Sequence, residues 1–358
     1  MSSNNKKAQQ EGIASKIAIV AGLSVVLIVG VVVIGLFMFT SLILDTPYVG
    51  SGGIYNGEFV YEGFPTEPSN SVDKMVVEYK GGTLYAGGQV RQEDFIVKII
   101  YGDGTEQVVT GYKSDIQDKN YRLQKVSNSI VFYYGKLSAI ITVVAVDVNT
   151  LQYPPSYVTT MVDEKKANDI ISAIDSGKLS YDEAFSKVAF TGDSQIKALS
   201  SYEILPGDRI VAKVGESFNY FNDNFDNIVA MCQDKDVLVV HYGINTLSIH
   251  EETRMEQIEF YKSILTRLQA ALPDVRIIVS GVFPVATNIY FNQQRFAYII
   301  DFDRELFKMC MELGIDYLSD NQYMEANQQV FSADGLHLTK SFYTDYWLKN
   351  LVTTMGIY

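Results

Sequence analysis

Hydrophobic and polar positions follow three different patterns along this chain of 358 residues. From Ile17 to Leu44 there is no charged side chain. From Val72 to Val148, short β-branched and aromatic runs are separated by turn signals such as Gly-Asp-Gly at 102–104. From Lys187 onward, short apolar runs alternate with amphipathic, helix-period segments. In chain order, these patterns predict a membrane helix, a small β domain and an α/β domain.

The uncharged run at 17–44 is long enough to cross a bilayer. At about 1.5 Å per residue it spans roughly 42 Å, against a bilayer core of about 30 Å. Lys6, Lys7 and Lys16 precede it and Asp45 follows it, so the positive-inside rule predicts a cytoplasmic tail at 1–16 and extracellular domains after the helix. A cleaved signal peptide is the alternative, but it would have a shorter apolar region and a small-residue cleavage site. We therefore expect a single-pass signal anchor in the plasma membrane.

Residues 45–186 predict a stalk, a β domain and a linker. The stalk, at 45–71, is rich in Gly, Ser, Pro and Tyr. Residues 72–150 predict a small all-β sandwich. This segment resembles bacterial immunoglobulin-like repeats of surface proteins through EYKGGTLYAGG, EDFIVKIIYGDGTEQVVTGY and the closing ITVVAVDV. The resemblance implies a spacer or a binding module. Residues 151–186 contain Pro154-Pro155 and a helical pattern from Asp163 to Lys178, and predict a linker and a helix.

Residues 187–358 predict an α/β fold with a parallel sheet between helices. The expected strands are Val188–Phe190, Ile210–Val214, Val237–Tyr242, Val275–Val282 and Ile315–Leu318. The expected helices are Phe218–Gln233, Glu252–Ala271, one around Phe296–Leu313 and a last one from about Lys340. In such sheets ligands bind beyond the carboxyl ends of the strands.

Polar and glycine residues gather just after these strands. Gly-Asp-Ser ends at Ser194, Gly215 follows the second strand, Gly-Ile-Asn ends at Asn245, and Asp334 precedes His337 by three residues. A serine at a strand-to-helix turn exposes its hydroxyl, and a weakly nucleophilic hydroxyl requires a base such as a histidine. An aspartate beside that histidine can fix its tautomer. A glycine N–H and an asparagine amide can stabilise an oxyanion.

Taken together, these four motifs in this order resemble the SGNH/GDSL hydrolase superfamily, over roughly 170 residues from Lys187. The resemblance implies Ser194 as nucleophile, His337 as base and Asp334 as its orienting acid. It also implies an oxyanion hole made by the backbone N–H groups of Ser194 and Gly215 and the side chain of Asn245. The third motif departs from the common GxND pattern, because Thr246 stands where the aspartate would be. The alternatives are a helix cap at Gly-Asp-Ser and plain turns at Gly215, Asn245 and Asp334.

Net charge and the spacing of cysteine and histidine residues argue against two classes of binding partner, nucleic acids and metal ions. The formal charge of −13 and pI of about 4.7 argue against nucleic acid, whose phosphates require basic surfaces. No Cys/His cluster has metal-ligand spacing, and we expect neither a metal nor an organic cofactor. Cys232 and Cys310 are expected to be buried and apolar, with one disulfide as the alternative.

These features predict a cell-surface serine esterase that removes O-acetyl or other short acyl groups from cell-wall or extracellular polysaccharide. Its partners would be an acylated carbohydrate or small ester and the membrane, through one helix. Two alternatives stay open. One is an O-acyltransferase that uses the same residues, and the other is a non-catalytic surface binding protein with a degenerate hydrolase fold.

Overall fold

The computed structural model describes residues 71–118, 120–290 and 292–358. The predicted cytoplasmic tail, the membrane helix and all but the last residue of the stalk lie outside the described residues. Within the described ranges, no helix combines the length and apolar character needed to cross a membrane.

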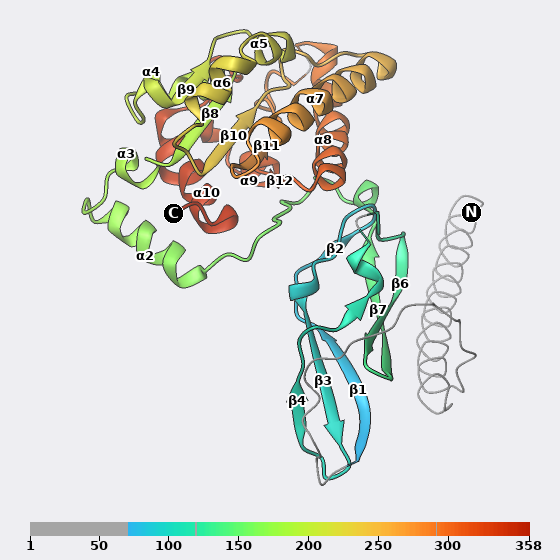
Figure 1. The fold of residues 1–358 in the computed structure, drawn as a ribbon. Helices are drawn as coiled ribbons and strands as arrows, with labels where there is room; N and C mark the ends of the chain where they lie inside the picture. Colours follow the sequence, from blue (N-terminus) through green and yellow to red (C-terminus); the bar gives the residue numbers. More distant parts are fainter. Residues whose placement is uncertain (1–70, 119, 291) are drawn as a thin grey trace, which may run out of the picture. The chain divides into compact units, whose positions relative to one another are not determined.

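A five-stranded parallel sheet forms the centre of the C-terminal region (Figure 1). Its strands are β8 (Val188–Gly192), β9 (Ile210–Ala212), β10 (Val237–His241), β11 (Arg276–Ser280) and β12 (Asp316–Leu318). They lie in the order β12-β11-β10-β8-β9. Counted along the chain this is the doubly wound order 2-1-3-4-5, whose connections reverse direction between the first and third strands. The switch point therefore lies between β8 and β10, and the predicted α/β class with a parallel sheet is confirmed.

Helices cover both faces of this sheet. They are α2 (Glu164–Asp175), α3 (Tyr181–Ala184), α4 (Ser194–Ser201), α5 (Phe218–Asp223), α6 (Phe225–Met231), α7 (Glu251–Ala271), α8 (Ile299–Leu313), α9 (Asn321–Ala326) and α10 (Leu348–Met355). Alternate residues of β10 enter opposite cores: Leu238 and Val240 pack with α5 to α8, whereas Val237 and Val239 pack with α4, α9 and α10. Because strand side chains alternate between faces, a run of apolar residues is what a doubly covered strand requires.

Two predicted helices are interrupted. The expected helix at Phe218–Gln233 breaks at Asn224, which ends α5 and precedes α6. The Asn224 amide donates to the Tyr220 carbonyl oxygen at 2.9 Å, and such side-chain bonds compete with the helical backbone pattern. The last helix contains a π-helical stretch at Phe342–Trp347 before α10. This wider turn buries Phe342, Tyr343 and Trp347 together.

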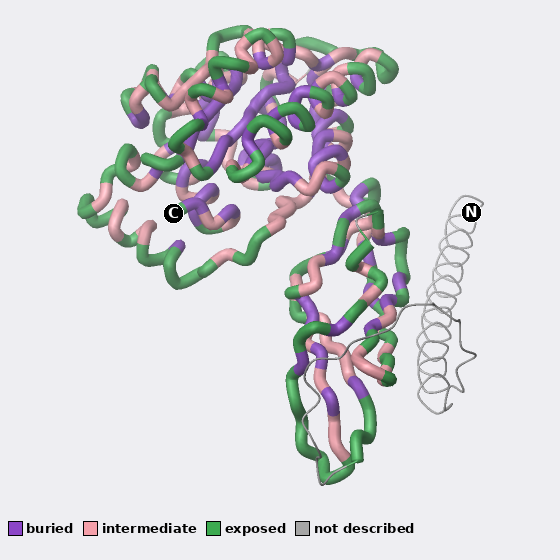
Figure 2. The backbone as a smooth tube through the Cα atoms, in the orientation of Figure 1, coloured by how far each residue is buried: buried purple, intermediate pink, exposed green. Residues whose placement is uncertain are grey.

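The N-terminal described region is built of β-strands. They are β1 (Val72–Tyr79), β2 (Leu84–Tyr85), β3 (Phe95–Tyr101), β4 (Glu106–Val108), β5 (Lys113–Ser114), β6 (Val126–Tyr134) and β7 (Leu137–Val146). They form a three-stranded sheet, β1-β3-β4, and a four-stranded sheet, β2-β7-β6-β5. Both sheets contribute to one apolar core that includes Phe95, Ile130 and Phe132, and buried positions alternate with exposed ones along the strands (Figure 2). An immunoglobulin-like relationship stays a prediction.

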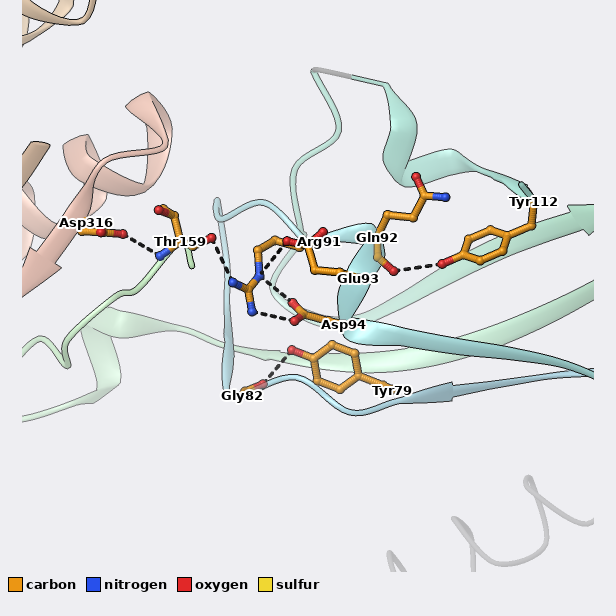
Figure 3. Close-up of polar contacts among 9 residues, drawn as sticks. All are labelled: Tyr79, Gly82, Arg91, Gln92, Glu93, Asp94, Tyr112, Thr159 and Asp316. Carbon is orange, nitrogen blue, oxygen red and sulfur yellow. Dashed lines mark hydrogen bonds and ion pairs between the residues drawn. The ribbon is translucent and has the colours of Figure 1, made fainter. Parts of the chain in front are cut away.

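Residues 151–160, predicted as part of the linker, carry polar contacts with both neighbouring regions (Figure 3). The Arg91 guanidinium makes two hydrogen bonds with the Asp94 carboxylate, at 2.6 and 3.0 Å, and donates to the Thr159 carbonyl oxygen at 2.9 Å. The Thr159 N–H donates to Asp316 at the start of β12. Asp316 is 1% exposed and also pairs with Arg276 at the start of β11. The linker is thus anchored where these two strands begin.

Both cysteines are buried free thiols in the structure. Burial raises the pKa of Cys232 to about 12 and that of Cys310 above its usual value. The expectation of two small apolar core residues is therefore met, and the disulfide alternative is not what the structure shows.

Candidate active site

Ser194 begins helix α4 directly after strand β8. Asp193 caps this helix, and its Oδ1 accepts from the Gln195 backbone N–H at 3.0 Å. Gly192 must be glycine, because a Cβ there would lie 2.3 Å from Ile196 Cγ1 and 2.6 Å from the His241 carbonyl oxygen. Because Gly192 has no side chain, α4 can begin directly against the end of the sheet. Ser194 therefore lies at the switch point.

The structure brings Ser194, His337 and Asp334 into one chain of polar contacts. Ser194 Oγ lies 3.1 Å from His337 Nε2, and His337 Nδ1 lies 2.7 Å from Asp334 Oδ2. A carboxylate accepts, so Nδ1 carries the proton and Nε2 presents its lone pair to the serine hydroxyl. This is the tautomer that a histidine requires in order to act as a base toward Ser194.

The Asp334 carboxylate organises the loop that carries His337. Its Oδ1 accepts from the backbone N–H groups of Leu336 and His337, both at 2.9 Å. Partial burial raises the pKa of Asp334, but hydrogen bonds from the His337 ring and from these two N–H groups outweigh it and lower the pKa to about 2. The carboxylate therefore stays ionised throughout the neutral range. Its side chain is 52% exposed and that of His337 is 40% exposed, so the pair is open to solvent.

Two of the three predicted oxyanion donors are backbone N–H groups, and neither donates a hydrogen bond to another described residue. One is that of Ser194, in the first turn of α4, where helix N–H groups lack intrahelical partners. The other is that of Gly215, in the turn after β9. Gly215 has φ +77°, a left-handed conformation that favours glycine.

The third predicted donor, Asn245, follows β10 and is already engaged. Its Nδ2 donates to the Glu216 carbonyl oxygen at 3.0 Å and to Asp193 Oδ2 at 3.3 Å. The bond to Asp193 is the weaker of the two by distance. An oxyanion beside Ser194 would therefore compete with Asp193 for this N–H, and catalytic hydrogen bonds are often looser before substrate binds.

Asp193, which the sequence presents only as the middle residue of Gly-Asp-Ser, is also part of the site. It is fully buried, and burial raises its pKa to about 7, against the lowering effect of the Gln195 backbone N–H and of His337. Its two oxygens join the start of α4 to Asn245. Asp193 therefore connects helix α4, which begins at Ser194, with Asn245.

The other two histidines lie outside this arrangement. His241 is 1% exposed at the end of β10, where its ring packs on Phe283 with centroids 4.1 Å apart, and burial lowers its pKa to about 3. His250 is exposed before α7. Among the described residues, neither makes a hydrogen bond to the Ser194 side chain.

A cavity of about 350 Å³ lies elsewhere, where β11 and β12 begin. Its lining includes Arg276, Ile277 and Ile315 and none of the five predicted site residues. The chemistry-bearing residues and this cavity are thus at different places in the fold, and the cavity does not define the site.

Comparisons with known proteins give the following similarities. No protein-family model matches the chain, and no curated protein matches it. Among solved structures, a GDSL-like lipase from Bacteroides thetaiotaomicron is 17% identical, with 52% of this chain and 96% of that one covered and a TM-score of 0.37. An acetyl xylan esterase from Geobacillus stearothermophilus is 13% identical, with 46% and 90% covered and a TM-score of 0.34. Both TM-scores are below 0.5, so the function proposed next rests on the site geometry.

Proposed function

We propose that this chain is a serine esterase that works through an acyl-Ser194 intermediate. The observation that carries the proposal is the contact of Ser194 Oγ with His337 Nε2, at 3.1 Å, combined with the 2.7 Å contact of His337 Nδ1 with Asp334. A serine that merely begins a helix has no need of such a histidine–carboxylate pair. A nucleophilic serine requires both.

The first half of the reaction forms the acyl-enzyme. Ser194 Oγ attacks the ester carbonyl carbon while His337 Nε2 takes the hydroxyl proton. The carbonyl oxygen gains negative charge, which the N–H groups of Ser194, Gly215 and Asn245 stabilise. The tetrahedral intermediate collapses, the C–O bond to the alcohol breaks, and His337 returns the proton to the leaving alkoxide.

In the second half, water replaces the alcohol. It gives one proton to His337 as its oxygen attacks the acyl carbon, and Ser194 leaves with that proton. Hydrolysis releases the carboxylic acid. An alcohol in place of water would transfer the acyl group instead, which is the alternative acyltransferase function.

The exposure of the site favours an ester carried by a large molecule. Asp334 and His337 are 52% and 40% exposed, and a polymer can reach such a surface more easily than a closed tunnel. The predicted anchor and stalk would present this surface outside the plasma membrane. We therefore propose acylated cell-wall or extracellular polysaccharide as the substrate class.

The experiment is ester hydrolysis by matched histidine variants. The segment from Ser51 onward would be assayed with short-chain aryl esters, alongside His337→Gln and His250→Gln. We expect His337→Gln to lose almost all turnover and the exposed control His250→Gln to retain it. Equal rates in all three proteins would rule out His337 as the base.

A further inference from the structure

Two polar side chains of the nucleophile's own helix bind the backbone on either side of His337. Gln195 Nε2 donates to the Leu336 carbonyl oxygen at 2.9 Å. Tyr202, which caps the other end of α4, donates through its hydroxyl to the Leu338 carbonyl oxygen, also at 2.9 Å. The two acceptors flank His337 directly, so the base and the nucleophile are held by one rigid element.

Gln195 is itself fixed at every polar atom of its side chain. It is 2% exposed, and its Oε1 accepts from the Tyr343 hydroxyl at 3.0 Å. Tyr343 belongs to the π-helical stretch and is fully buried. The rings of Tyr343 and Tyr202 lie 6.1 Å apart between centroids. The two contacts to the His337 loop are therefore supported by one packed group.

The backbone of Leu336 is therefore held at both its N–H and its carbonyl group. Its N–H donates to Asp334 Oδ1 and its carbonyl accepts from Gln195. Ala333 and Asp334 are exposed, and the rest of the loop is held by backbone bonds, among them Ser332 N–H to the His337 carbonyl oxygen at 2.7 Å. The contacts from Gln195 and Tyr202 are those that tie this loop to helix α4. Turnover depends on the Ser194–His337 distance, and a misplacement of about 1 Å can cost about 10²-fold in rate.

We propose that Gln195 and Tyr202 are positioning residues that hold the His337 backbone against helix α4 and so set the 3.1 Å contact between His337 and Ser194. Their side-chain hydrogen bonds go to backbone carbonyls and to Tyr343, not to the Ser194 hydroxyl or the His337 ring. The inference rests on the proposed function, because it assigns a role within that same site.

The test uses the full chain and three variants that differ by few atoms. Gln195→Met removes both polar groups of the amide at similar length. Tyr202→Phe removes one hydroxyl from the other contact. Tyr261→Phe is the matched control, since the Tyr261 hydroxyl is buried in α7 without a hydrogen-bond partner in the structure. For each, kcat and KM on an aryl ester would be measured together with hydrogen exchange of peptides covering 332–340.

We expect kcat to fall by about 10- to 10²-fold in Gln195→Met and by about 3- to 10-fold in Tyr202→Phe, with KM little changed, because only the geometry of the reacting groups is disturbed. Exchange at 332–340 should rise in both and stay unchanged over β8 and β10. Tyr261→Phe should match wild type in every measurement. A purely structural role would instead leave the kcat of the folded fraction intact.

Wild-type kcat in folded Gln195→Met and Tyr202→Phe would overturn the proposal, as would raised exchange without a change in kcat. If Gln195→Met does not fold, Tyr202→Phe decides alone. If the wild type shows no Ser194-dependent turnover, the proposed function fails, and the exchange comparison then decides separately whether these residues hold the loop: a rise at 332–340 supports this, and no rise contradicts it.

Discussion

His337 Nε2 lies 3.1 Å from the Ser194 hydroxyl, although 143 residues separate the two in the chain. The contact depends on the sheet and not on local sequence. Ser194 leaves β8 at the switch point, and the His337 loop returns to it after β12. The carboxylate of Asp334 then selects the histidine tautomer that can accept the serine proton.

Asn245→Ala should lower kcat by about 10²- to 10³-fold, the usual cost of losing one oxyanion donor. KM should change much less, because the charge that Asn245 stabilises develops only during attack. Steady-state kinetics and a melting curve on the same preparation measure this. Asn224→Ala is the control, since Asn224 only joins α5 to α6, and it should lose stability but not kcat. A destabilised Asn245→Ala with normal kcat would reduce Asn245 to a turn residue.

Asp334→Asn should lower kcat by about 10²-fold or more, because an amide no longer enforces the tautomer with Nδ1 protonated; about 10⁴-fold is known for a triad aspartate. Backbone N–H groups of Leu336 and His337 can still bind the amide oxygen, so the fold should persist. Because the pKa of Asp334 is lowered to about 2, wild-type kcat should show no step from this group above about pH 3. A variant with wild-type kcat would contradict its orienting role.

The folded chain should melt at a higher temperature at pH 5.5 than at pH 8. Burial raises the pKa of Asp193, Asp303 and Asp320 from 3.8 to about 7. Each protonated carboxyl contributes fully to the free energy of unfolding below pH 3.8. Between pH 3.8 and about 7 this contribution falls by roughly 1.4 kcal/mol per group and pH unit, and above about pH 7 it is lost. His241, whose pKa is lowered to about 3, acts in the opposite direction below pH 6.5, but it is a single group against three.

Asp320→Asn tests the origin of this pH dependence. Asp320 is 3% exposed and its Oδ1 accepts from the Asn350 amide at 2.7 Å, so an asparagine there can keep this bond while removing the group that titrates. The variant should show a smaller difference in melting temperature between pH 5.5 and pH 8. A wild-type protein that melts higher at pH 8 would show that these carboxyls do not dominate.

Protease added to intact cells should release a fragment that contains residues 187–358. This follows from the lysines before the predicted membrane run and Asp45 after it. Immunoblotting of the medium, with a cytoplasmic protein as the control for lysis, measures the release. Full protection in intact cells, with cleavage only after lysis, would reverse the proposed topology.

The α/β class and its strands could be predicted because the apolar runs are short and, except in β9, almost completely buried on both faces. Val237 to Val240 are all buried, as a strand covered by helices requires. The positions of Ser194 and Asn245 followed from one rule, that functional residues in such sheets gather beyond the carboxyl ends of the strands. The motifs after the first three predicted strands were therefore readable without coordinates.

The side-chain hydrogen bonds around the site could not be predicted from the sequence in this way. Gln195 and Tyr202 carry no pattern that marks them as donors to the His337 loop, because those bonds join side chains to backbone carbonyls about 140 residues away. The bond between Asn245 and Asp193 depends equally on tertiary packing. The break at Asn224 could have been suspected, since asparagine disfavours helix interiors.

The central claim is that Ser194 is a nucleophile activated by His337, and intact mass after reaction with a fluorophosphonate tests it most directly. Wild type should gain one phosphonyl adduct, which peptide mapping places on Ser194. Ser194→Ala should gain none, and His337→Gln should react far more slowly. A wild-type protein that stays unmodified, or a Ser194→Ala variant modified to the same extent, would contradict the account.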